Sequence, residues 1–121
     1  MKTKFMLLVV LVVMIVAGIS SSHVVRAQAA PRRIEITAKR FSYEPGEITL
    51  KKGEPVVLVI KSADVAHGLS FRELNLNAKV DKGGSAELPF TPTKTGDFVG
   101  HCSVFCGSGH GSMILTMHVV D

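Results

Sequence analysis

The residues with the most evident chemistry lie in one short segment of the chain. It holds Cys102, Cys106, His110 and Met113 in the spacing C-x3-C-x3-H-x2-M, and the chain has no other cysteine. Thiolate and thioether sulfurs are soft ligands that favour copper, and imidazole is compatible with it. Magnesium and calcium require oxygen ligands, which this segment hardly offers. The sequence therefore predicts a copper site here.

The elements that position this segment are predicted to be β-strands. Apolar and polar residues alternate from residue 34, and residues 55–60 are rich in β-branched side chains. No stretch after residue 29 keeps a helical period, and turn signals recur between short strand-like runs. We therefore expect an all-β sandwich or barrel. Its predicted strands cover 34–37, 48–50, 55–60, 67–71, 85–90, 97–102 and 114–120, separated by turns at 44–46, 51–54, 81–84 and 92–96.

A further ligand is expected from outside the segment. The segment lies between two predicted strands, which makes a site built on it rigid. The donors of this one loop are expected to leave copper under-coordinated, so another donor must come from elsewhere. His67 is the best candidate, because it begins a predicted strand directly after the turn-like Ser62-Ala63-Asp64.

Residues 1–29 are interpreted as a secretory signal peptide. Lys2 and Lys4 precede an apolar run from Phe5 to Ile19, and a small-residue cleavage pattern, Ala27-Gln28-Ala29, follows. The run of about 15 residues is shorter than the roughly 20 that a spanning helix needs. An uncleaved anchor is the alternative. In either case residues 30–121 are expected to form one domain outside the cytoplasm, periplasmic or secreted.

Charge and length exclude some functions. Three of the 14 basic residues and none of the 10 acidic ones lie in the first 29 positions, so the remaining chain carries a net charge of +1. It has no basic cluster with interleaved aromatic residues, which argues against nucleic-acid binding. About 90 residues are enough for one small core.

Several motifs occur in a familiar order. They are S-A-D-V-A-H at 62–67, F-T-P at 90–92, G-D-F-V-G-H-C at 96–102, and the cysteine segment itself. From Ile34 to Asp121 the chain resembles the copper-A domain of cytochrome c oxidase subunit II, which is a cupredoxin with a Greek-key β-sandwich. The carboxy-terminal domain of nitrous-oxide reductase has the same loop spacing. The chain differs from subunit II in having Val104 where an acidic residue is usual and in having no tryptophan.

The resemblance implies a binuclear copper-A centre that transfers single electrons. The two cysteine sulfurs would bridge two coppers, each histidine would hold one copper, the methionine would be a weak axial ligand and one backbone carbonyl would serve the second copper. The implied ligands are His67, Cys102, Val104 (through its carbonyl), Cys106, His110 and Met113.

The same resemblance implies a redox partner such as a cytochrome c or a terminal oxidase. With every coordination position filled by the protein, neither copper is open to a substrate. We therefore expect an electron carrier that is not an enzyme on its own, although it can be a component of an oxidase. Contact with a membrane is expected only if residues 1–29 are not cleaved.

Other interpretations stay open from the sequence. The chain can be a mononuclear cupredoxin that uses one cysteine, or a protein that stores or delivers copper. In an oxidising compartment, Cys102 and Cys106 can form a structural disulfide. Zinc accepts two cysteines and two histidines, but Met113 is a poor zinc ligand.

The remaining polar residues near the site have weaker predictions. Strand alternation places His101 on the face opposite Cys102, exposed or beside the ligands, and makes His118 structural or solvent-facing. Asp64 orients a ligand through a hydrogen bond or simply forms a turn. The glycines around His110 (Gly107, Gly109 and Gly111) are predicted to let a partner approach closely.

Overall fold

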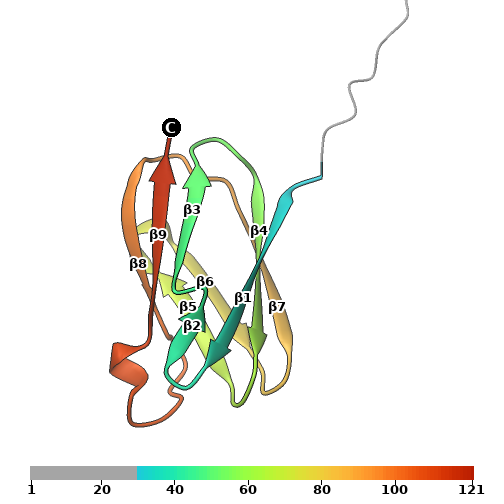
Figure 1. The fold of residues 1–121 in the computed structure, drawn as a ribbon, viewed down its shortest axis with the longest axis vertical. Helices are drawn as coiled ribbons and strands as arrows, with labels where there is room; N and C mark the ends of the chain where they lie inside the picture. Colours follow the sequence, from blue (N-terminus) through green and yellow to red (C-terminus); the bar gives the residue numbers. More distant parts are fainter. Residues whose placement is uncertain (1–29) are drawn as a thin grey trace, which may run out of the picture.

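Two β-sheets pack face to face around one core in the protein (Figure 1). The structure, a computed structural model, describes residues 30–121. These residues form nine strands and two short 3-10 helices, η1 and η2, and contain no α-helix. The elements are β1 (Arg32–Lys39), β2 (Ser42–Glu44), β3 (Glu47–Lys51), β4 (Val56–Ser62), β5 (His67–Phe71), η1 (Arg72–Leu74), β6 (Leu76–Val80), β7 (Ser85–Phe90), β8 (Gly96–His101), η2 (His110–Ser112) and β9 (Ile114–Val120).

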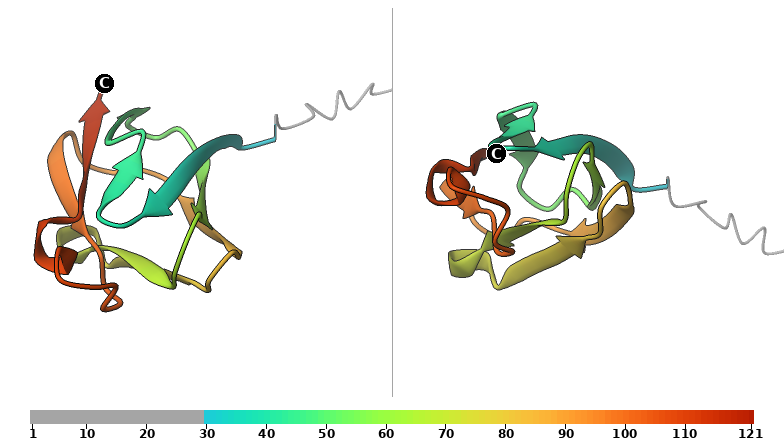
Figure 2. Two further views of the ribbon diagram at one scale, coloured as in Figure 1. Left: turned by 60° about the horizontal axis from the view of Figure 1, so that its bottom comes forward. Right: turned by 90° about the horizontal axis from the view of Figure 1, so that it is seen from below.

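The strand order confirms the predicted all-β, cupredoxin-like sandwich. One sheet has the order β2-β1-β4-β7 and the other β3-β9-β8-β5-β6, so the chain crosses repeatedly between the sheets. Two pairs, β1 with β4 and β3 with β9, are parallel, and the other pairs are antiparallel. Seen from below in Figure 2, the strands surround a common interior like a flattened barrel.

The core follows from alternation along the strands. In β9, Leu115, Met117 and Val119 point inward and are buried, while the residues between them are partly exposed. In β4, Leu58 and Ile60 face the same interior from the opposite sheet. Burying such aliphatic side chains supplies the main free energy that holds the sheets together.

The predicted strands are all present, with ends that differ by up to two residues, but two strands were missed. β2 occupies Ser42–Glu44, where the prediction had only the beginning of a turn, and β6 occupies Leu76–Val80. β2 has only three residues, and β6 lies at the edge of its sheet with exposed positions at Asn77 and Lys79. Neither strand carries the run of β-branched residues that marks a buried strand.

The predicted leader, residues 1–29, lies outside the described residues, so the choice between signal peptide and anchor stays a prediction. Between residues 30 and 121, the structure has no helix of the length and hydrophobicity required to cross a membrane.

The connection from β8 to β9 carries the predicted ligands at one end of the sandwich. In Figure 1 it is the orange-to-red loop at the bottom, containing η2, whereas the carboxyl terminus lies at the top. The amide of Cys102 donates a hydrogen bond to the carbonyl of Met113 across the base of this loop (3.2 Å). The loop is therefore closed at its base, directly beyond the ends of two paired strands.

Candidate metal centre

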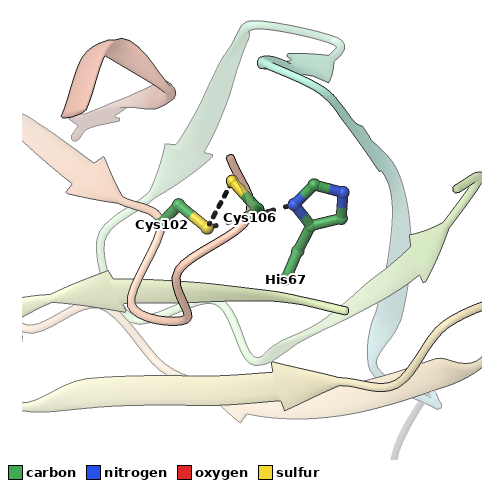
Figure 3. Close-up of side chains that lie close together, drawn as sticks. All are labelled: His67, Cys102 and Cys106. Atoms are coloured by element: carbon green, nitrogen blue, oxygen red, sulfur yellow. Dashed lines mark hydrogen bonds between the residues drawn. The ribbon is translucent and has the colours of Figure 1, made fainter. Parts of the chain in front are cut away.

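The two cysteines form the centre of the candidate site. Cys102 directly follows the last residue of β8, and Cys106 lies four residues later in the connection to β9. Both thiols are free and buried, and their sulfurs are 3.6 Å apart. A disulfide bond is about 2.05 Å long. The sulfurs are thus close enough to share metal ions without being bonded to each other, as Figure 3 shows.

His67 reaches the sulfurs from the neighbouring strand β5. Its side chain is fully buried, and its Nδ1 lies 4.0 Å from Cys102 Sγ (Figure 3). On the other side of the ring, Nε2 donates a hydrogen bond to Oδ1 of Asp64 (2.6 Å). This bond keeps the proton on Nε2 and leaves the Nδ1 lone pair directed at the sulfurs. The imidazole is held in the tautomer that a metal ligand requires.

The other three predicted donors also reach the two sulfurs. His110 Nδ1 lies 3.6 Å from Cys106 Sγ, and Met113 Sδ lies 3.7 Å from the same sulfur. The carbonyl oxygen of Val104 lies 3.0 Å from Cys102 Sγ. The structure therefore brings all six predicted donor atoms together, although their roles as ligands stay a prediction.

The donor set fits copper. It offers two thiols, two imidazole nitrogens, a thioether and a carbonyl, a combination in which soft sulfur and imidazole donors dominate. Met113 is completely buried, and its sulfur lies 3.7 Å from Cys106 Sγ. A zinc site gains nothing from such a thioether.

Asp64 and Arg40 connect the two halves of the site. The Arg40 amide donates to Asp64 Oδ2 (2.8 Å), and the Arg40 guanidinium Nε donates to the Cys106 carbonyl (2.9 Å). Arg40 thus lies between the carboxylate that holds His67 and the loop that holds Cys106. Partial burial tends to raise the pKa of Asp64, but hydrogen bonds from the Arg40 amide, His67 and the Val65 amide outweigh it and lower the pKa to about 2. The carboxylate is charged at neutral pH.

Phe41 packs against the loop between β8 and β9, which we call the ligand loop because it carries the predicted ligands. A Cβ added at Gly109 would lie 2.5 Å from Cγ and Cδ2 of the Phe41 ring, and one at Gly107 would lie 2.9 Å from the same ring. Gly107 also has a φ of +137°, which disfavours other residues. The prediction that these glycines open the surface to a partner is therefore wrong for Gly107 and Gly109. It fits only Gly111, where an added Cβ would meet nothing within 4 Å.

Tyr43 fixes the strand that carries His67. Its hydroxyl donates a hydrogen bond to the carbonyl of Gly68, and the ring is buried in the core. Burial, followed by the proximity of Cys102, raises the pKa of this phenol well above its usual range. Sequence reasoning missed Arg40, Phe41 and Tyr43, because they come from the β1–β2 hairpin and no local spacing relates them to the cysteines.

Both cysteine thiols are buried. Burial, and then the hydrogen bond with Cys102, raises the pKa of the Cys106 thiol to about 11. A buried thiol of this kind is protonated and unreactive at neutral pH in the absence of a metal. Since metal binding requires thiolates, loading with copper must release protons.

One side of the site reaches the surface. Phe105 is 79% exposed, and its ring is tilted against the ring of His110 with a centroid separation of 5.6 Å. His110 is half-buried, whereas His67 is fully buried. Of the two histidines in the donor cluster, His110 is therefore the one that reaches toward the surface.

The two remaining histidines of the domain lie outside the donor cluster. His101 is exposed at the end of β8, as strand alternation predicts. His118 is half-buried on β9, with Nδ1 2.6 Å from Asp97 Oδ1 and Nε2 3.7 Å from Glu47 Oε2. The hydrogen bond from His118 to Asp97 is the main cause that raises the pKa of this imidazole.

Comparison with known proteins identifies the family. The model of the cupredoxin-like domain matches residues 7–115. The chain belongs to the cupredoxin-like family.

Two relatives align with the greater part of this chain. Cytochrome c oxidase subunit 2 of Thermus thermophilus is 31% identical over 88 residues, which are 73% of this chain and 65% of that protein. Nitrous-oxide reductase of Cupriavidus necator is 31% identical over 90 residues, which are 71% of this chain and 14% of the reductase. The chain therefore resembles cytochrome c oxidase subunit II, as predicted, but spans only part of each relative.

A solved structure shows the same fold. The periplasmic domain of subunit II of cytochrome oxidase from Bradyrhizobium japonicum superposes with a TM-score of 0.69 at 22% identity. The alignment covers 78% of this chain and 87% of that domain. The two-sheet architecture described above is thus also found in that solved domain.

Proposed function

We propose that the protein is a binuclear copper-A electron carrier that works outside the cytoplasm. The donor set supports this proposal most directly. His67 Nδ1 lies 4.0 Å from Cys102 Sγ and His110 Nδ1 lies 3.6 Å from Cys106 Sγ, so each sulfur has one histidine beside it. Two sulfurs shared between two ions, with one histidine for each, suit this arrangement better than one ion.

The chain's own residues prepare this site for rapid electron exchange. A bound copper pair would supply the one-electron redox chemistry. Asp64 holds the His67 ring in one tautomer, and Arg40 fixes the carbonyl beside Cys106. Donors held by packing and hydrogen bonds move little when the charge on the metal changes. Restricted movement lowers the reorganisation that accompanies each electron transfer.

The surroundings of the site determine how electrons enter and leave. Met113 and His67 are completely buried, so water is excluded on the inner side. His110 and Phe105 form the outer edge. We infer that a partner exchanges electrons across this edge, and that the partner is a redox protein such as a cytochrome c or a terminal oxidase of which this chain would be a component. The relatives named cytochrome c oxidase subunit 2 support this inference.

Copper titration tests the proposal. The full chain is reduced, supplied with increasing copper, and freed of unbound metal before copper and protein are measured. We expect saturation at two coppers per chain and loss of both thiols to a thiol reagent. His118→Gln is the matched control, because this histidine lies outside the cluster, and it should bind as much copper as the unmodified chain.

Two results would contradict the proposal. Saturation at one copper, with one cysteine still reactive, would make the protein a mononuclear cupredoxin or a copper-delivery protein. Failure to bind copper, together with an absence of free thiols, would show that the cysteines form a structural disulfide.

A further inference from the structure

An open hollow lies beside the candidate metal centre, on the flank formed by η1 and the end of β8. It has a volume of about 350 Å³ and is lined by Arg72, His101, Cys102, His110 and Gly111. Two of these residues belong to the donor cluster, so the hollow comes directly to the edge of the site. Its polar wall consists of one guanidinium and two imidazoles and contains no carboxylate.

Arg72 is the strongest charge in this hollow. It is exposed, and none of the ion pairs within residues 30–121 includes it. The other three arginines of the described residues differ in this respect. Arg32 and Arg33 pair with glutamates, and Arg40 donates to the Cys106 carbonyl. Arg72 therefore retains all its donors for a group outside the chain.

His101 places a second donor next to Arg72. It is exposed at the end of β8, across from Ser70 of β5, while Arg72 follows β5 by one residue. Both side chains also line an adjoining hollow of about 300 Å³ with Phe71, Glu73, Phe98 and Val99. Glu73 is the acidic residue of that second hollow and does not line the first. The hollow beside the metal centre thus has the positive charge of Arg72 and no acidic side chain in its wall.

We propose that Arg72 and His101 form a docking site for a surface carboxylate of an acidic redox partner protein. A guanidinium with free N–H groups along its edge binds a carboxylate through two parallel hydrogen bonds, and an imidazole N–H can donate a third. A carboxylate held there would bring the partner's surface over His110, the outward ligand, and beside the exposed ring of Phe105. The inference rests on the proposed function, because it assigns a role in electron exchange.

The hollow and the Phe105 ring, which packs against His110, together provide the two features expected of a transient electron-transfer contact. Complementary charge accelerates encounter and orients the partner, and the apolar Phe105 ring allows close contact without a large desolvation cost. A partner with a basic surface would be repelled from this flank by Arg72. The chain is therefore expected to discriminate between partners by the sign of their charge.

Stopped-flow electron exchange tests this docking site. The probes are a basic cytochrome c and the same protein after succinylation of its lysines, which makes it acidic. The copper-loaded full chain should react faster with the acidic form at low ionic strength. Arg72→Gln should lower that rate about threefold to tenfold and weaken its salt dependence, because one steering charge is lost.

Lys94→Gln is the matched control. It removes the same charge from an exposed residue in the loop before β8, at the opposite end from the ligand loop. It should change the rate with the acidic probe by less than about twofold. Combining Arg72→Gln with His101→Ala should lower the rate further than Arg72→Gln does alone.

The outcomes separate the docking site from the function. Equal effects of Arg72→Gln and Lys94→Gln, or a faster reaction of the unmodified chain with the basic probe, would overturn the docking site. Reduction of the loaded chain by dithionite is measured in parallel. If dithionite does not reduce the loaded chain reversibly, the proposed electron carrier fails, and the docking site fails with it.

Discussion

Replacing Gly109 with alanine should reveal how tightly the ligand loop rests on Phe41. The added methyl group would lie 2.5 Å from two carbons of the Phe41 ring. Ordinary carbon–carbon contacts are about 3.5–4.0 Å, so the ring or the loop must move by about 1 Å. The backbone itself tolerates alanine, because φ of Gly109 is −92°. The effect is therefore steric.

The expected magnitude follows from the cost of overpacking. Inserting a methyl group into a filled space costs typically about 1–3 kcal/mol. For a domain of this size, about 2 kcal/mol corresponds to a fall in melting temperature of roughly 8–16 °C. Because η2 and His110 follow Gly109 directly, the absorption spectrum of the copper-loaded protein should change as well.

Gly111→Ala is the natural control. A Cβ at this position meets nothing within 4 Å, and the substitution adds the same methyl group two residues away. Thermal unfolding of the two apo-proteins by circular dichroism, followed by absorption spectra after loading, makes the comparison. The reasoning is refuted if Gly109→Ala lowers the melting temperature no more than Gly111→Ala. A double variant of Phe41→Leu with Gly109→Ala should lose less stability than the sum of the single changes.

Three further predictions concern residues around the site and on the sheet surface. Arg40→Met removes the donor to the Cys106 carbonyl, so copper should pass faster to a chelator than in the control Arg33→Met; equal rates would exclude a role for Arg40. Tyr43→Phe leaves the Gly68 carbonyl without its buried donor and should cost about 1–3 kcal/mol in urea unfolding, and an unchanged midpoint would contradict the bond. His118 has a pKa raised first by its hydrogen bond to Asp97, so its stabilising effect should be fully present below pH about 6.5 and fade as the pH rises through the higher folded value. The urea midpoint of the unmodified chain should therefore approach that of His118→Gln as the pH rises from 5.5 to 8.5, measured at intervals of about half a pH unit. A constant difference between the two midpoints would contradict a contribution from the titration of His118.

The sequence specified the buried strands and the donor cluster well, for physical reasons. Strands such as β4 consist of β-branched residues whose alternation fixes which face is buried, and β9 follows the same period. The ligand spacing was readable because four donors lie in one short loop, where sequence distance limits spatial distance. His67 was identified as a candidate because it follows the turn-like residues 62–64. In the structure, Asp64 of that turn accepts a hydrogen bond from the His67 ring.

The supports of the site could not be predicted in the same way. Arg40 lies 66 residues before the cysteine whose carbonyl it contacts, and only the strand order of the fold brings them together. Gly107 and Gly109 were expected to face a partner, because their missing side chains suggest open space. In the fold that space is filled by Phe41. Such contacts depend on tertiary packing, which produces no periodic residue pattern that could be recognised in the sequence.

Electron paramagnetic resonance of the copper-loaded, partly oxidised full chain tests the central claim most directly. Two coppers that share one unpaired electron through Cys102 and Cys106 should give a signal whose hyperfine splitting comes from two equivalent copper nuclei. The same signal should be absent after Cys106→Ser. A signal split by a single copper nucleus in the unmodified chain would contradict the binuclear centre.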